Sequence, residues 1–193
     1  MSIRSDAGPG GSTTLPPGPA AATAMVPVWD KLVRAFHWSL VGLFVVAYAT
    51  AEDADGLHRF AGYCIAALLA LRVVWGFIGS RHARFTDFVR SPRAVLAYLK
   101  LAGTHRAPRY LGHNPAGGAM TIALMAMIGG ICWTGHLMTT STGWGSEALE
   151  GVHAALANGT LLLIGLHLLG NLFSSVLHRE DLTRSMITGL KRT

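Results

Sequence analysis

Charged residues are scarce in this chain. Asp, Glu, Lys and Arg make up 13% of its 193 residues, and hydrophobic residues make up 51%. The mean hydropathy is positive, at +0.39, and soluble domains carry about 25% charged residues. The composition therefore favours a protein embedded in a membrane. The formal charge of +6 lies beside apolar segments and not on a soluble basic face, which argues against nucleic-acid binding.

Cysteine is also scarce. Only Cys64 and Cys132 are present, both within apolar segments, so a disulfide framework and a CxxC metal site are excluded. The CxxCH sequence is absent, which excludes covalent attachment of a c-type haem. Residues 1–26 are rich in Pro, Gly and Ala and lack the continuous apolar region of a signal peptide. We predict a disordered tail over 1–26, followed by one domain over 27–193.

Long apolar runs are abundant. A membrane-spanning helix needs about 20 mostly apolar residues, and four segments satisfy this: Val33–Thr50, Leu57–Ile78, Gly117–Met138 and Gly151–Leu177. The sequence therefore predicts an all-α fold, an integral membrane bundle of four transmembrane helices.

The connections between these segments differ in charge. Those after the first and third segments carry acidic residues, whereas the long connection after the second holds seven basic residues against one acid, Asp87. By the positive-inside rule, both termini and the long connection are cytoplasmic. Within it, residues 86–100 place Phe88, Val95, Leu96 and Leu99 at helical spacing, which predicts a short amphipathic helix on the membrane surface. A plain solvated loop is the alternative.

Four histidines stand in or beside the predicted spans. His153 and His167 are fourteen residues apart, which is about 21 Å along one face of a helix at 1.5 Å per residue. His58 begins the second span at the level of His153, and His37 lies near the inner end of the first span at the level of His167. We predict two bis-histidine sites, His58 with His153 at the outer side and His37 with His167 at the inner side.

Pairs of neutral imidazoles on facing helices suit the two axial positions of a low-spin haem iron. Zinc is less suitable because no carboxylate or thiolate lies at these depths to complete its ligand set. We therefore predict b-type haem. Arg72 lies inside the second span at the inner level, and a haem propionate is its expected partner, with snorkelling to the headgroups as the alternative. Arg34 and Arg59 are weaker propionate candidates.

Several segments together resemble the bacterial cytochrome b561 family, in particular its branch described as the cytochrome b subunit of Ni,Fe-hydrogenase. They are VWDKLVRAFHWSLVGLF, LHRFAGYCIAALLALRVVWGFIG, ARFTDFV, RYLGHNPAGGAM, VHAALANGTLLLIGLHLLG and HREDLTRSMITGLKR, and the resemblance covers residues 27–193. It implies a four-helix cytochrome of the bacterial inner membrane with two b haems. It also implies axial ligands at His37, His58, His153 and His167.

The resemblance further implies electron transfer between a redox partner and quinone or another carrier. Membrane lipid, quinone, a periplasmic cytochrome c and hydrogenase-type subunits are the partners it implies, and a homodimer is left open. We place Trp38, Trp75 and His113 beside a quinone slot at the inner side. Hydrogenase-linked members often have a further span, so a stand-alone quinone-linked carrier is an equal alternative. Whether the chain is itself an enzyme stays open.

Two other functions compete with this interpretation. A histidine-relay ion transporter would need acidic residues inside the spans, and the four apolar segments contain none. A membrane anchor or assembly subunit for a larger oxidoreductase needs no haem. Replacing His37 or His167 by alanine separates these functions, because only the cytochrome loses haem.

Overall fold

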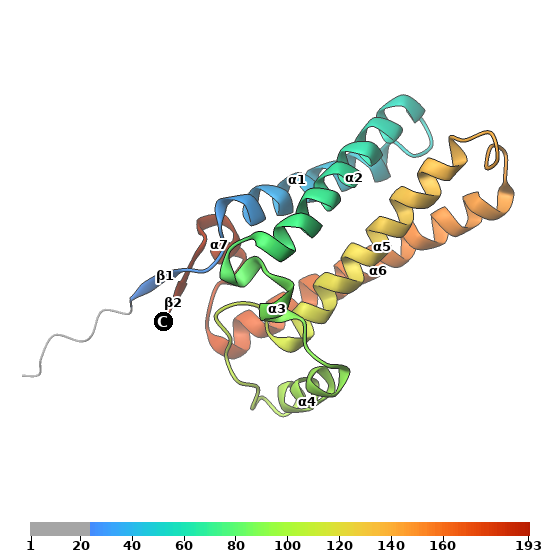
Figure 1. Cartoon of the computed structure of the whole chain (residues 1–193). Helices are drawn as coiled ribbons and strands as arrows, with labels where there is room; N and C mark the ends of the chain where they lie inside the picture. The colour runs from blue at the N-terminus through green and yellow to red at the C-terminus, as the bar shows by residue number, and fades with distance from the viewer. Residues whose placement is uncertain (1–23) are drawn as a thin grey trace, which may run out of the picture.

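The fold is almost entirely helical in the computed structural model, which describes residues 24–193 (Figure 1). Four helices are long and apolar enough to cross a membrane. In chain order the elements are β1 (Met25–Pro27), α1 (Lys31–Ala49), α2 (Asp55–Ile78), the 3-10 turn η1 (Arg81–Ala83), α3 (Phe85–Phe88), α4 (Pro92–Gly103), α5 (Pro115–Met138), α6 (Glu147–His178), α7 (Leu182–Thr188) and β2 (Leu190–Arg192).

The long helices form two antiparallel hairpins that run side by side (Figure 1). Helix α1 packs on α2, α5 packs on α6, and α2 joins the hairpins through α5. Large apolar side chains such as Phe77 and Val176 remain about 70% exposed on the outside of the bundle, at 69% and 71%. Apolar surface of this extent matches a lipid environment and not water. The predicted all-α membrane bundle is confirmed.

Helix boundaries follow local capping chemistry. The Asn114 side chain accepts a hydrogen bond from the Gly117 amide at 2.7 Å, and Pro115 occupies the first position of α5. Helix α6 starts at Glu147, before the predicted Gly151, because Ser146 caps it and acidic residues in the first turn suit the positive end of the helix dipole. The four predicted spans otherwise match the long helices within a few residues.

The helix predicted over residues 86–100 is partly wrong. Pro92 begins α4, and the extended Ser91 before it separates this helix from α3. Phe88 therefore belongs to α3, where it is buried, and does not share a face with Leu96 and Leu99. Helix α4 is amphipathic as predicted: it buries Tyr98 and exposes both leucines.

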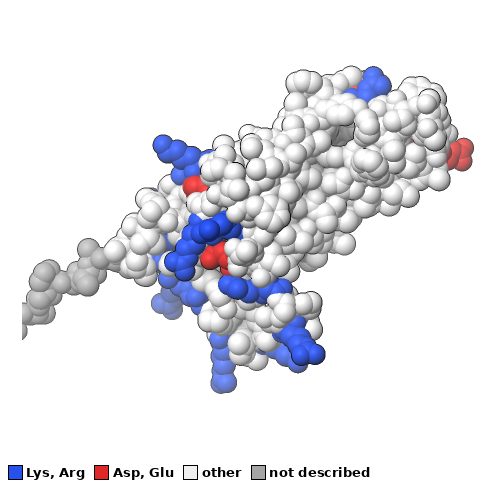
Figure 2. Space-filling model, in the orientation of Figure 1, with Lys and Arg blue, Asp and Glu red and all other residues white. Residues whose placement is uncertain are grey.

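Basic side chains gather at one end of the bundle (Figure 2), whereas the connections at the other end carry most of the acidic residues near the helix ends. Basic side chains surround α3, α4 and α7, and we call this the basic end; the connections α1–α2 and α5–α6 form the acidic end. At the basic end β1 pairs antiparallel with β2, with Val26 opposite Lys191. The predicted boundary of the tail at residue 26 therefore falls inside β1, and residues 1–23 lie outside the described residues.

Candidate functional site

At the acidic end, two of the predicted histidines face each other. His58 lies in the first turns of α2 and His153 lies on α6. The centres of their rings are 6.1 Å apart, and the ring planes make an angle of 69°. The structure thus brings together the pair that the sequence predicted from depth alone.

Neighbouring groups fix which nitrogen of each ring carries the proton. The Nδ1 atom of His58 lies 2.8 Å from the carbonyl oxygen of Ala47, which can only accept, so Nδ1 donates. The hydroxyl of Thr134 donates to the Gly130 carbonyl at 2.9 Å, so its oxygen accepts from Nδ1 of His153 at 3.0 Å. Both rings therefore keep the Nε2 lone pair available, the arrangement that second-shell partners give to metal-binding histidines.

The spacing of this pair suits a metal ion held from both sides. Two metal–nitrogen bonds of about 2 Å, and about 1 Å from each nitrogen to its ring centre, place the ring centres about 6 Å apart. The observed 6.1 Å agrees. Among residues 24–193 no three His, Cys, Asp or Glu side chains converge on one point, so zinc lacks the donors it needs. His58 and His153 would supply two imidazole nitrogens to a haem iron.

The second predicted pair consists of His37 on α1 and His167 on α6, both toward the basic end. The His37 ring meets Trp38 edge-on, with 5.1 Å between ring centres. Its Nδ1 is buried and has no hydrogen-bond partner among the described residues. Burying a polar atom without a hydrogen-bond partner costs folding free energy unless a further group supplies that partner.

Arg72 is buried in α2, with 3% of its surface exposed. Its Nη2 donates to the Ala83 carbonyl at 3.0 Å, and the guanidinium lies 5.4 Å and 5.9 Å from the ring centres of Phe85 and Phe88. Its Nη1 is buried without a partner among residues 24–193. Snorkelling into headgroups does not describe this side chain, which points into protein and keeps one donor edge for a further acceptor.

The other two arginines already have protein partners. Arg34 Nη1 donates to the Thr188 carbonyl at the end of α7, while its Nε is buried without a partner within the described chain. Arg59 forms an exposed ion pair with Asp55, with Nη2 and Oδ2 2.9 Å apart. Arg34 thus keeps one donor directed into the protein, and Arg59 lies in a solvated pair at the acidic end.

His113 has a larger role in the structure than sequence reasoning gave it. Its ring lies between Trp29 and Phe88, with ring centres 4.8 Å and 4.7 Å away, and its Nδ1 has no partner in residues 24–193. Burial, and then the charges of Arg72, Lys191 and His167, lower the pKa of His113 to about 3. The ring is therefore neutral at pH 7 and offers a hydrogen-bond acceptor close to Arg72.

Of the three residues that we placed beside a quinone slot, Trp75 has a polar partner within the protein. Trp75 Nε1 donates to Asp30 Oδ2 at 3.0 Å, and Ser80 donates to the same oxygen. Burial alone raises the pKa of Asp30, but hydrogen bonds from Ser80, the Val33 amide and Trp75 outweigh it and lower the pKa below its usual value. This cluster joins the start of α1 to the end of α2.

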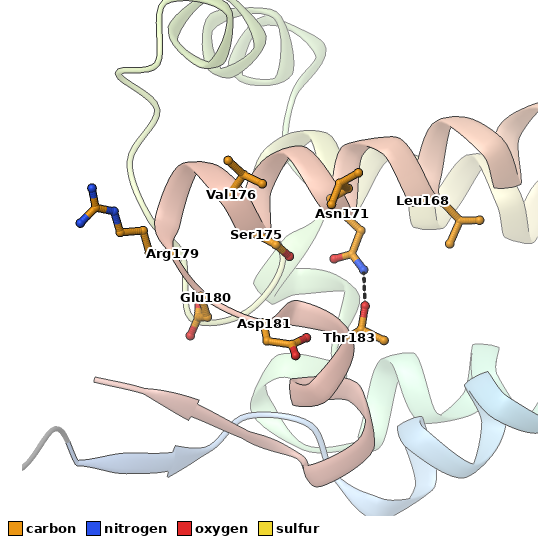
Figure 3. Close-up of a pocket in the computed structure, with 9 residues that line it drawn as sticks. Leu168, Asn171, Ser175, Val176, Arg179, Glu180, Asp181 and Thr183 are labelled. Atoms are coloured by element: carbon orange, nitrogen blue, oxygen red, sulfur yellow. Dashed lines mark hydrogen bonds between the residues drawn. The ribbon is translucent and has the colours of Figure 1, made fainter.

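A groove does open between α6 and α7 (Figure 3). It has a volume of about 440 Å³ and combines apolar and polar side chains: Leu168, Asn171, Leu172, Ser175, Val176, Arg179, Glu180, Asp181 and Thr183. The Asn171 amide donates to the Thr183 hydroxyl at 3.4 Å. Sequence reasoning missed this groove because α7 could not be placed beside α6 from local patterns.

Four helices that could cross a membrane, with a facing histidine pair between α2 and α6, are features expected of a membrane-embedded cytochrome of the b type. A family model described as prokaryotic cytochrome b561 matches residues 28–189, and the chain belongs to this family. The family description and the four apolar helices place the chain among membrane-embedded b-type cytochromes.

One curated relative is a probable Ni/Fe-hydrogenase B-type cytochrome subunit from Rhizobium leguminosarum bv. viciae. It is 34% identical over 115 residues, which cover 46% of this chain and 48% of the relative. The chain thus spans about half the length of that relative. No solved structure matches.

Proposed function

We propose that this chain is a di-haem cytochrome b that carries electrons between the two ends of its helical bundle. His58 and His153 hold one haem at the acidic end, and His37 and His167 hold the other at the basic end. Fourteen residues separate His153 from His167 on α6, about 21 Å along the helix axis. Bound haem supplies one-electron chemistry at each level.

The observation that carries the proposal is the arrangement at His58 and His153. The ring centres are 6.1 Å apart, and each Nδ1 proton is engaged by a backbone carbonyl or a hydroxyl. Each side chain is therefore held in the tautomer that presents Nε2 to a metal. Fixed ligand orientation reduces the rearrangement that accompanies a change of one electron.

At the basic end, the chain offers donors for the acidic groups of a haem. Arg72 directs its unpartnered Nη1 into the protein near His113 and His167, and a propionate is the acceptor that we assign to it. Arg34 Nε is a second donor at this end. Arg59 is assigned to a propionate at the acidic end, where it would exchange or share its contact with Asp55.

The charge asymmetry sets the proposed orientation. Basic residues collect at one end of the bundle (Figure 2), and cytoplasmic loops of membrane proteins carry an excess of Lys and Arg. We therefore place the basic end and both termini at the cytoplasmic side of a bacterial inner membrane. Residues 27–193 form one domain, and residues 1–26 precede it as a tail that contributes β1 residues at its end.

Quinone is the proposed membrane partner, and the groove between α6 and α7 is its proposed place (Figure 3). Apolar side chains Leu168 and Leu172 open it to lipid, while Asn171 and Ser175 supply polar contacts. The groove lies along the same helix, α6, as the proposed basic-end ligand His167, with Leu168 as its first lining residue. We propose that quinone exchanges electrons there.

The partner at the other end is either a hydrogenase-type subunit or a periplasmic cytochrome c. The name of the Rhizobium relative favours a hydrogenase-type partner. A homodimer is compatible with either partner. The acidic end, with Glu147 and Glu150 beside the His58–His153 pair, would favour a partner with a basic surface.

A vesicle experiment tests transfer between the two ends. The purified protein is incorporated into liposomes with an impermeant oxidant trapped inside, an impermeant reductant is added outside, and haem oxidation is followed optically. We expect transfer in the wild type and its loss in His153→Ala and in His37→Ala, because each removes one of the two levels. Full transfer in both variants would contradict the proposal and favour an anchor subunit.

A further inference from the structure

A second groove lies between α4 and α5. Figure 1 shows α4 on the opposite side of the basic end from α7. It has a volume of about 510 Å³, which falls in the range of small-molecule sites. Its lining is apolar except for one arginine: Val89, Arg90, Pro92, Val95, Leu96, Gly118, Ala119, Ile122 and Ala123. Nothing in the electron-transfer mechanism uses it.

The groove has a structured end where two segments approach closely. A Cβ atom on Gly118 would lie 2.4 Å from the backbone oxygen of Phe88, so only glycine lets this segment cross α5 here. Beyond this crossing, the small side chains of Ala119 and Ala123 leave the groove along α5 unfilled. The groove therefore begins at Gly118, where Phe88 packs against α5, and runs along the first turns of a helix that could cross a membrane.

The open side of the groove faces lipid. Leu96 and Leu99 on α4 are 60% and 50% exposed, and Ile122 on α5 is 38% exposed. These residues lie at the basic end of the spans, where an amphipathic helix such as α4 rests at the boundary between headgroups and acyl chains. An occupant of the groove would enter from this leaflet and would be apolar along most of its length.

The mouth of the groove is cationic. Arg90 Nη2 donates to the Asp87 carbonyl oxygen at 2.7 Å, which holds the guanidinium beside the groove. The Asp87 carboxylate is already engaged by His82 at 3.0 Å and Arg81 at 3.8 Å, so it does not neutralise Arg90. Arg93 lies outside the lining itself, but it is exposed in the first turn of α4 and follows the lining residue Pro92, so it adds a second cation near this end of the helix. An anionic group at this level would complement both.

We propose that this groove binds one anionic phospholipid of the leaflet at the basic end. An acyl chain fills the channel along Ala119 and Ala123, and the headgroup phosphate accepts hydrogen bonds from Arg90 and Arg93. The lipid fixes α4 against α5 and so stabilises the connection that carries Phe88 and packs against Arg72. This assignment rests on the groove and its charges and does not depend on the number of haems.

Native mass spectrometry of the full chain in detergent tests the proposal. Phosphatidylglycerol and phosphatidylcholine are added in equal amounts, and the adducts retained on the intact protein are counted. We expect the wild type to retain phosphatidylglycerol preferentially. Combined Arg90→Gln and Arg93→Gln should reduce this preference by about fivefold for each arginine, since each cation near an anionic lipid surface contributes about that factor.

Two further variants separate the groove from general attraction to basic surfaces. Ala119→Leu fills the exposed channel and keeps both arginines, so it should lower retention of both lipids. Arg106→Gln removes a cation from the same connection outside the groove and should leave the preference unchanged. Haem content, read from the absorbance spectrum, checks that each variant is folded.

The proposal is overturned by any of three results. One is equal retention of the two lipids by the wild type. Another is unchanged retention in Ala119→Leu. The third is a loss of preference in Arg106→Gln as large as that in the double arginine variant. Such a result would show that the basic surface attracts anionic lipids in general and not at this groove.

Discussion

The hydroxyl oxygen of Thr134 lies 3.0 Å from Nδ1 of His153 and joins α5 to a proposed haem ligand on α6. Because the same hydroxyl donates to the Gly130 carbonyl, its oxygen can only accept from the imidazole. Gly135 makes this approach possible, since a Cβ atom there would lie 3.2 Å from Cε1 of His153. The contact orients the ring and fixes its tautomer.

Thr134→Val keeps the shape of this side chain and removes its oxygen. We expect haem affinity at the acidic end to fall by about 10- to 100-fold, the usual effect of losing a partner of a metal-binding histidine. The basic-end haem should be unaffected. Titration of haem into the haem-depleted protein, followed by absorbance, measures both sites.

Thr160→Val is the matched control. Thr160 is fully buried on α6, and its hydroxyl donates only to the Leu156 carbonyl at 2.8 Å. The Thr160→Val variant loses the same kind of oxygen without removing a hydrogen bond to a histidine, so both haem affinities should match the wild type. Equal effects of the two valine variants would show that Thr134 acts through helix packing alone.

Arg72→Gln tests the cation at the basic end. A positive charge near a haem favours the reduced form, so its loss should lower the midpoint potential of the basic-end haem, on the order of tens of millivolts. Arg59→Gln removes a solvated arginine at the acidic end and should leave that potential unchanged. A redox titration of each variant checks this, and equal shifts at both haems in Arg72→Gln would contradict a local role.

Glu180 holds two cations at the basic end. Its Oε1 accepts from Arg109 Nη2 at 2.9 Å, and Lys191 Nζ lies 3.9 Å from Oε2. Lys191 and Glu180 are both buried, so Glu180→Gln leaves an uncompensated buried charge and should destabilise the protein by about 3 kcal/mol. Glu150→Gln, an exposed acid at the acidic end, is the control, and thermal unfolding followed by size-exclusion chromatography is the measurement. Equal thermal stability of the two variants would contradict this role.

Acid should destabilise the basic end through His113. Its pKa is about 3 in the folded chain, below its ordinary value of 6.5, so the unfolded state binds more protons between these limits. This contribution to stability is complete above pH 6.5 and is lost as the pH falls toward 3. The His113→Gln variant should lose less stability than the wild type between pH 7 and pH 5. Parallel unfolding curves would show that His113 does not titrate in this way.

The sequence was sufficient for features that depend on local patterns. The four spans follow from apolar runs, and the start of α5 follows from Asn114 and Pro115, because a cap and a proline act within one turn. The pairing of His58 with His153 was also predicted, since depth along a membrane helix follows from residue count. In each case the physical cause lies within one helix or in the membrane itself.

Contacts between distant segments could not be predicted. His113 lies between Trp29 and Phe88, and Arg34 reaches Thr188, which is 154 residues away. Both contacts depend on how α3 and α7 fold back under the bundle. The expected shared face of Phe88 and Leu96 was wrong because Pro92 starts a new helix between them. From the sequence alone, Thr134 is an ordinary residue of an apolar span. Its contact with His153 becomes evident only when α5 and α6 are packed against each other.

The most direct test of the account is a haem count on the purified wild-type chain. A dithionite-reduced minus oxidised absorbance spectrum is recorded, and haem is extracted and quantified against protein. The account predicts the sharp α band of low-spin b-type haem and two haems per chain. One haem per chain, in protein produced with ample haem, would contradict one of the two histidine pairs.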